Sequence, residues 1–302
     1  MIFTETGPVG SGFHVLGTAA MPTYLLEGSV PVLFDAGLSC LGPVFEKAIR
    51  ETLGQEPPQK LFLTHLHFDH CGAAAHLKRV FPGLDVAASA RGAAIIKRPG
   101  AIRLIKRLNI EAAEMIRSWG MTEVGDEPFE PFEVDLVLED GQEVELGDGL
   151  SVRAMATPGH TRDFMSYHIP ERKILIGSEA VGCAAMNGYV VSDCLVSYDD
   201  FMSSLKKLSH LEVDILAQGH HFVYTGEDVP AFFERSIRSA VRFREMVLEF
   251  WEKEGTLSGV MARLRAIEYD PQPPPMQLEQ AYLINLEARI RAAGAGLIEF
   301  DE

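Results

Sequence analysis

Four side chains that can bind a metal ion lie within six residues of this chain, at His65, His67, Asp69 and His70. They directly follow the apolar run 61–63, which has the length and flanks of a buried strand. Ligands usually sit where strands end, so this segment predicts a site at the edge of a sheet. In an extended segment, side chains two residues apart point the same way, so His65 and His67 can hold one ion. The turning chain after them then presents Asp69 and His70 to a second ion.

Three further ligand candidates lie later in the chain, and each follows a short apolar run with the pattern of a buried strand. They are His160, Glu179 and His220, and the runs are residues 150–156, 173–176 and 213–217. His160 offers a third histidine to the first ion, His220 adds an imidazole to the second, and Glu179 can bridge both. The alternative is a set of ordinary polar loop residues. The dense first cluster argues against it, since the chain has only 10 histidines in 302 residues.

The ordered ligand set resembles that of the metallo-β-lactamase fold superfamily of metal-dependent hydrolases. That family carries a His-x-His-x-Asp-His motif, a lone histidine in a Gly-His-Thr turn, a bridging aspartate after a glycine, and a last histidine in a Gly-His turn. The corresponding positions in this chain are residues 65–70, His160, Glu179 and His220. Residues 32–37 also resemble the family's early strand, whose aspartate braces the metal loop. The combined pattern is specific for the fold and less so for the reaction.

Within that superfamily, the chain looks most like the quinolone-signal response thioesterase of pseudomonads, and more distantly like glyoxalase II. Both likenesses imply a thioester substrate. One feature departs from the family: its bridging aspartate is replaced here by Ser178-Glu179, with a longer side chain and one extra residue. A carboxylate still suits divalent ions, but the extra methylene requires a displaced backbone. This departure bears on the metal spacing and on occupancy of the second site.

The resemblance implies a dinuclear hydrolase in which a hydroxide shared by two divalent ions attacks a small acyl substrate, most simply a thioester. The first ion is assigned to His65, His67 and His160, and the second to Asp69, His70 and His220, with Glu179 across both. Asp69 is also expected to move a proton, and His221 to donate to the oxyanion or the substrate. Zinc, iron and manganese are compatible with this ligand set. No separate cofactor-binding residues are predicted.

Two other classes of function are alternatives to a thioesterase. A phosphodiesterase or lactonase would use the same ligands, and a regulatory binding protein could carry a weakened metal site. A flavin-linked diiron oxidoreductase is a weaker fit, because that branch typically has a glutamate in the motif and a flavodoxin domain. The chain carries 43 Asp and Glu against 27 Lys and Arg, which argues against a nucleic-acid partner. The basic stretch 97–107 could hold an anionic cofactor, although a solvated helix face is the preferred interpretation.

The length and a hydrophobic content of 47% suit one main domain with an appendage. Residues 1–225 are expected to form an α/β metal-binding domain, a four-layer αββα sandwich. Strands are expected near residues 12–16, 24–27, 30–35, 61–63, 85–89, 135–138, 143–146, 150–156, 173–176 and 213–217. Helices are expected at residues 43–53, 72–81, 101–119, 230–253, 257–267 and 276–292. The helical extension 226–302 is expected to cover the active-site cleft, or else to form a homodimer contact.

The N-terminus has no basic stretch followed by an apolar core, and no apolar run reaches the length of a membrane span. The chain is therefore expected to be a soluble cytoplasmic protein without a membrane partner. The four cysteines are widely spaced in a chain large enough to fold without cross-links, so free thiols are expected.

Overall fold

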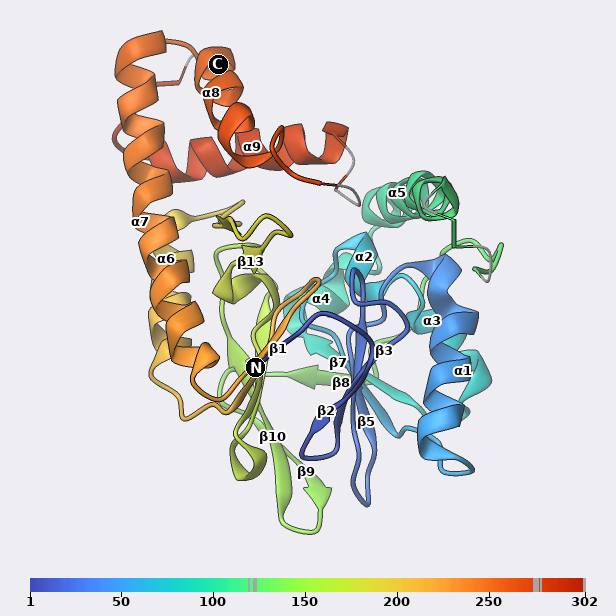
Figure 1. Ribbon diagram of the computed structural model, residues 1–302. Coiled ribbons are helices and arrows are strands. Elements are labelled where there is room, and N and C mark those ends of the chain that lie inside the picture. The colour runs from blue at the N-terminus through green and yellow to red at the C-terminus, as the bar shows by residue number, and fades with distance from the viewer. Residues whose placement is uncertain (119, 122–123, 274–276, 278, 301–302) are drawn as a thin grey trace.

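Two β-sheets face each other in the centre of the molecule, and helices cover both outer faces (Figure 1). This computed structural model describes residues 1–118, 120–121, 124–273, 277 and 279–300. The arrangement confirms the predicted αββα sandwich. No helix in the described part of the chain has an 18-residue stretch apolar enough to cross a lipid bilayer.

The first sheet joins its strands in the order β2, β3, β4, β5, β6, β7, β8. Their bounds are β2 Gly7–Gly10, β3 Phe13–Leu16, β4 Thr23–Leu26, β5 Val32–Phe34, β6 Lys60–Phe62, β7 Asp85–Ser89 and β8 Leu136–Leu138. Strands β5 to β8 run parallel. Parallel neighbours need a crossover rather than a tight turn. The crossovers contain helices α1 (Gly42–Leu53), α2 (Phe68–Cys71), α3 (Ala74–Val80), α4 (Ala90–Ile95) and α5 (Pro99–Ser118).

The second sheet joins its strands in the order β1, β16, β15, β12, β11, β10, β9. Their bounds are β1 Ile2–Phe3, β9 Glu143–Gly147, β10 Leu150–Ala156, β11 Met165–Ile169, β12 Ile174–Ile176, β15 Ile215–Ala217 and β16 Val223–Thr225. Strands β12 and β15 are parallel, and helix α6 (Tyr198–Ser209) lies in their crossover. A separate short hairpin pairs β13 (Cys183–Ala184) with β14 (Val190–Val191).

Three apolar layers hold the sandwich together. The central layer lies between the sheets, where the rings of Phe34, Phe62 and Tyr167 pack with centroids 5.2 to 5.8 Å apart. A second layer joins the first sheet to α1, α3 and α5, and a third joins the second sheet to α6 and the C-terminal helices. Strands such as β5 and β12 are therefore buried on both faces, which explains why they read as continuous apolar runs.

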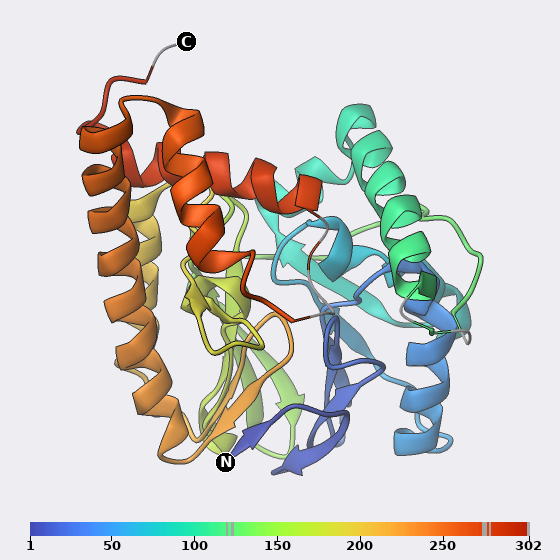
Figure 2. The same cartoon turned by 45° about the horizontal axis from the view of Figure 1, so that its top comes forward.

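Three helices follow the last strand: α7 (Asp228–Glu254), α8 (Leu257–Glu268) and α9 (Glu279–Gly294). Gly255 ends α7 in the left-handed conformation, and Thr256 caps α8 by accepting a hydrogen bond from the Gly259 amide. Figure 2 shows α8 and α9 at the end of the sandwich where α2 and α5 also lie. The predicted helices at 230–253 and 257–267 are thus confirmed. The predicted start of the last helix at residue 276 lies outside the described residues, as does the end of the 101–119 helix.

The structure differs from the sequence expectation in several places. The predicted helix 72–81 begins only at Ala74, because the amides of Gly72 and Ala73 bond to carbonyls of the loop after β5. A short helix, α2, precedes it instead. Helix α6 was not expected, although Ser197 caps it and apolar residues recur at helical spacing along it. The pairing of β1 with β16 joins segments more than 200 residues apart, which no local pattern can reveal.

Candidate metal centre

All the predicted ligands follow strands that end at one edge of the sandwich. The cluster His65 to His70 follows β6, His160 follows β10, Glu179 follows β12, and His220 follows β15. Gly159 permits the approach of α6 behind His160, since a Cβ there would lie 2.4 Å from the backbone of Phe201. Three groups of possible ligand atoms result, each with its atoms within 4.8 Å of one another.

The first group contains His65, His67 and His160. Nδ1 of His67 lies 3.1 Å from Nε2 of His160, and the buried Nε2 of His65 has no hydrogen-bond partner within the described structure. Burial lowers the pKa of His65 well below its usual value, and burial together with His160 lowers that of His67 to about 4. Both imidazoles are therefore neutral at pH 7, the state that binds a metal ion.

The other two groups share His70 and lie beside the first. One contains Asp69, His70 and His220, and the other contains His65, His70 and Glu179. Oε1 of Glu179 lies 3.0 Å from Nε2 of His70 and 3.2 Å from Nε2 of His220. Oδ2 of Asp69 lies 3.7 Å from the same His220 nitrogen. Oε2 of Glu179 also lies 3.9 Å from Nδ1 of His65, which is assigned to the first site. The carboxylate of Glu179 therefore lies near histidines of both predicted metal sites.

The local backbone accommodates Glu179 in place of the family's aspartate. Ser178 adopts a positive φ of 48° and opens a short 3₁₀ turn that contains Glu179. Gly219 leaves the space that the longer side chain fills, because a Cβ there would lie 2.0 Å from Oε1 of Glu179. Burial alone would raise the pKa of Glu179, but His70 and a hydrogen bond from His220 hold it well below its usual range. Glu179 is therefore a carboxylate, a state that can accept a cation.

Hydrogen bonds orient the outer nitrogens of three of the histidines. Nδ1 of His70 lies 2.9 Å from Oδ2 of Asp35, which also accepts from the hydroxyl of Thr64. Nδ1 of His160 donates to the carbonyl of Asp193 at 2.8 Å, and Nδ1 of His220 donates to the carbonyl of Ala20 at 2.7 Å. These contacts leave Nε2 of each ring free to face the centre. Such outer partners fix the tautomer and orientation of metal-binding histidines.

The donor set fits divalent ions. Tetrahedral zinc with bonds of about 2.0 Å places its ligand atoms about 3.3 Å apart, and separations of 3.0 to 3.7 Å occur within the cluster. The ligands are nitrogen and carboxylate oxygen, which suit zinc, iron and manganese alike. The buried, unpaired nitrogen of His65 is otherwise costly and is explained by such an ion.

His221, the second predicted catalytic residue, belongs to none of the three ligand groups. Its ring centroid lies 6.4 Å from that of His220, and its main-chain amide donates to the carbonyl of Ala19. Burial and the neighbouring His220 lower its pKa to about 4, so it is neutral at pH 7. Its catalytic role stays a prediction.

Sequence reasoning missed two residues that support the centre. Asp193 accepts the hydrogen bond from His160, and Asp163 accepts one from the amide of Leu66 through Oδ2 at 3.0 Å. Asp163 lies three residues after His160, but neither aspartate has a pattern that marks it. The four cysteines are free, as expected.

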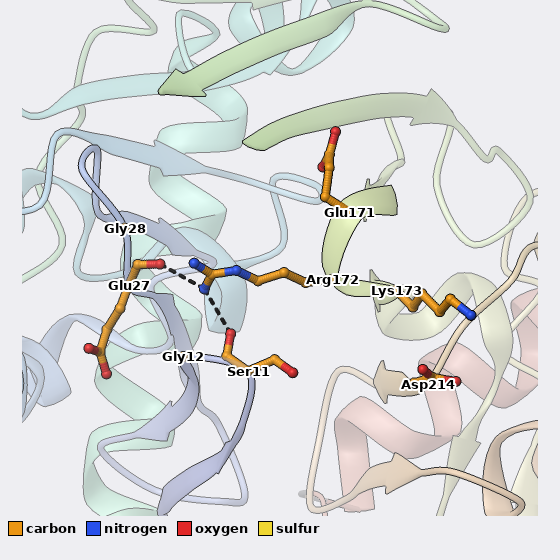
Figure 3. A pocket seen from close by; sticks show the side chains of 8 residues that line it. All are labelled: Ser11, Gly12, Glu27, Gly28, Glu171, Arg172, Lys173 and Asp214. Atoms are coloured by element: carbon orange, nitrogen blue, oxygen red, sulfur yellow. Dashed lines mark hydrogen bonds between the residues drawn. The ribbon is translucent and has the colours of Figure 1, made fainter. Parts of the chain in front are cut away.

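A polar pocket of about 860 Å³ lies away from the ligand cluster (Figure 3). It is shallow and lined by Ser11, Gly12, Glu27, Gly28, Glu171, Arg172, Lys173 and Asp214. Lys173 and Asp214 precede β12 and β15, whereas Glu179 and His220 follow these strands. The pocket is therefore at the opposite end of the second sheet. Arg172 crosses it to donate to the carbonyls of Ser11 and Glu27, which makes it a structural link between the sheets.

Comparison with known proteins gives the same fold. A solved archaeal metallo-beta-lactamase superfamily protein from Sulfolobus tokodaii superposes with a TM-score of 0.60 at 19% identity, covering 95% of this chain and 100% of that one. In sequence, a metallo-beta-lactamase fold-containing protein of Sulfurisphaera tokodaii is 26% identical over 200 residues, which are 65% of this chain and 71% of that protein.

Two further relatives are thioesterases by name. The atrochrysone carboxyl ACP thioesterase of Aspergillus fumigatus is 25% identical over 211 residues, 70% of this chain but only 50% of that enzyme. An acyl-coenzyme A thioesterase of Gallus gallus is 28% identical over 213 residues, 65% of this chain and 73% of that enzyme. The closer likeness to the pseudomonad thioesterase stays a prediction. A sequence model of the Metallo-beta-lactamase superfamily matches residues 22–220, about two thirds of the chain, and the protein therefore belongs to that superfamily.

Proposed function

We propose that this protein is a dinuclear metal-dependent hydrolase that cleaves a small acyl thioester. The observation that carries the proposal is the convergence of three ligand groups. The middle group, His65, His70 and Glu179, shares His65 with one outer group and His70 with the other. Two neighbouring groups of this kind suit a pair of cations better than a single one. The thioesterase names of two relatives support the substrate class.

In this proposal His65, His67 and His160 would hold the first ion, Asp69, His70 and His220 would hold the second, and Glu179 would contribute to both sites. When bound, the ions supply a Lewis acid for the carbonyl and lower the pKa of water toward neutrality. The protein's own part is to orient the imidazoles. Asp35, Asp193 and the carbonyl of Ala20 do this from outside the cluster.

Asp69 is the proposed proton carrier, and His221 is the proposed hydrogen-bond donor. The side chain of Asp69 is 21% exposed, whereas that of Glu179 is 3% exposed, so Asp69 is the carboxylate that solvent and substrate can reach. A carboxylate there can accept a proton from the attacking water and pass it to the leaving thiolate. The neutral ring of His221 can donate a hydrogen bond to the carbonyl oxygen as negative charge develops.

The helical segment 226–302 is proposed to cover the cleft as a separate appendage. Its helix α9 reaches the loop that supports the metal site, because Nε of Arg289 donates to the carbonyl of Ser192 at 2.9 Å. The next residue in that loop, Asp193, holds His160. This connection supports a cover over the site, with a homodimer contact as the competing use of the same helices.

Metal analysis and a substrate panel test the proposal. Protein purified without chelator should contain about two equivalents of transition metal. It should hydrolyse acyl thioesters in preference to lactones and to bis(p-nitrophenyl) phosphate. Turnover of the phosphodiester alone would replace the thioesterase with a phosphodiesterase. Less than one metal per chain, without hydrolysis of any member of the panel, would favour a binding protein.

A further inference from the structure

Helices α4 and α5 carry an isolated basic stretch in an otherwise acidic chain. Residues 90–110 contain six Lys and Arg and no Asp or Glu, although the whole chain has a formal net charge of −16. The six cations are Arg91, Lys97, Arg98, Arg103, Lys106 and Arg107, and all are exposed. A concentration of one charge against the sign of the whole protein marks a place where an anion is favoured.

Most of these cations have no acidic partner among the residues that the structure describes. Arg107 lies 3.7 Å from Glu111, the first acid after the stretch. The five side chains before it have no ion pair within the described residues. On α7, by contrast, exposed Arg238, Arg242 and Lys253 each pair with a glutamate on the same helix. A solvated helix face usually looks like α7, so the basic stretch is not explained as one.

The basic stretch contacts the loop that carries the first predicted ligands, residues 63–70, through both helices. Leu66, which lies between two of the predicted ligands, packs against α4 so closely that a Cβ on Gly92 would lie 2.6 Å from it. From α5, Asn109 donates to the carbonyl of Phe68 at 3.2 Å. Both helices therefore lie beside the predicted centre, at the same end of the sandwich as α2 (Figures 1 and 2). Arg162, exposed and two residues after His160, adds another cation without an ion pair in the described structure.

We infer that this basic stretch binds the phosphate groups of a thiol carrier whose acyl thioester is the substrate. The inference rests on the proposed thioester hydrolysis and names the part of the substrate that gives affinity. A thioester with its carbonyl at the metal loop must extend its thiol portion out of the centre, and α4 and α5 lie next to that loop. Phosphates are the anions that clustered Lys and Arg recognise. The acidic remainder of the chain disfavours a long nucleic acid as the occupant.

The test compares two thioesters of one acyl group, on coenzyme A and on N-acetylcysteamine, which lacks phosphate. The variant is Arg98→Gln/Arg103→Gln/Lys106→Gln, and the matched control is Arg238→Gln/Arg242→Gln/Lys253→Gln, with the same charge change. The variant should raise KM for the coenzyme A thioester about 10-fold, as three exposed charge contacts allow. Its kcat/KM for the N-acetylcysteamine thioester should equal that of wild type. Added salt should raise KM for the coenzyme A thioester in wild type and in the control, and much less in the variant.

Calorimetry with coenzyme A itself separates this inference from the proposed function. Binding that the variant loses and the control keeps supports the phosphate site, even if no thioester is hydrolysed, in which case the hydrolase proposal alone fails. Equal loss in variant and control, or no binding by wild type, overturns the inference. Equal effects of the variant on the two thioesters overturn it as well. If the variant loses binding to anionic lipid vesicles but still binds coenzyme A, the basic stretch is a membrane contact and the inference is overturned.

Discussion

Oδ2 of Asp35 lies 2.9 Å from Nδ1 of His70, and the same carboxylate accepts hydrogen bonds from the amide and hydroxyl of Thr64. Asp35 itself has a left-handed backbone with a φ of 56°, so the turn after β5 is shaped to aim this side chain. One carboxylate therefore fixes both the start of the metal loop and one of its predicted ligands.

Replacing Asp35 with asparagine should weaken metal binding about 10-fold to 100-fold, the usual effect of losing an outer partner of a ligand. The amide keeps the size of the side chain but loses the charge that orients the His70 ring. Titration against a competing chelator measures the change. Asp85→Asn, at an exposed acid paired with Lys60, is the control. Unchanged affinity in the Asp35 variant would show that the contact is only structural.

Gly219→Ala should disturb the centre through Glu179, because the new Cβ would lie 2.0 Å from Oε1. The expected result is a loss of bound metal and of hydrolysis. Shortening the carboxylate by one methylene in Gly219→Ala/Glu179→Asp should restore part of both, since aspartate leaves room for the Cβ. Gly100→Ala is the control, as nothing lies within 4 Å of that position. If the single variant binds metal like wild type, Gly219 does not set the position of Glu179.

His67→Ala should remove the ion of the first group and reduce hydrolysis about 10³-fold or more, the order expected for loss of a metal's Lewis acidity. The fold should persist, because His67 is half-buried and its ring bonds only to His160 within the described structure. Elemental analysis and circular dichroism check both points. His210→Ala, at an exposed histidine on the end of α6, should have no effect.

The two predicted metal sites should differ in acid sensitivity. Burial would lower the pKa of His70 and His220, but Glu179 raises both, so a cation in the second group must displace protons near neutral pH. The pKa of His65 is lowered well below its usual value and that of His67 to about 4, so protons compete with a cation at these two histidines only in more acidic solution. Dialysis from about pH 7.5 to about pH 5 should therefore release one equivalent first. His220→Ala should abolish that first step, and retention of it would contradict the assignment.

The sequence predicted which side chains converge because each candidate ligand follows a strand, and strand ends are where a local pattern carries spatial information. His65 to His70, His160 and His220 converge for this reason alone. The role of Gly219 could not be predicted in this way. The space that this glycine leaves is filled by the side chain of Glu179, which lies 40 residues earlier in the chain. Contacts such as Asp193 with His160 also depend on loops whose paths are set by packing against α9. Local periodicity cannot contain that information.

Arg289 and Glu268 form a buried pair that joins α9 to α8, with two hydrogen bonds of 2.8 and 2.9 Å. The two side chains are at most 1% exposed. Arg289→Met should destabilise the fold by about 3–5 kcal/mol, because the buried Glu268 loses its cation and keeps only the hydrogen bonds from Tyr189 and Tyr282. Arg289→Met/Glu268→Gln should recover much of this in urea unfolding. Since Arg289 also holds Ser192, both variants should bind the first metal more weakly than wild type, by about 10-fold. If the double variant recovers stability and metal affinity together, the loop beside His160 is held by other contacts.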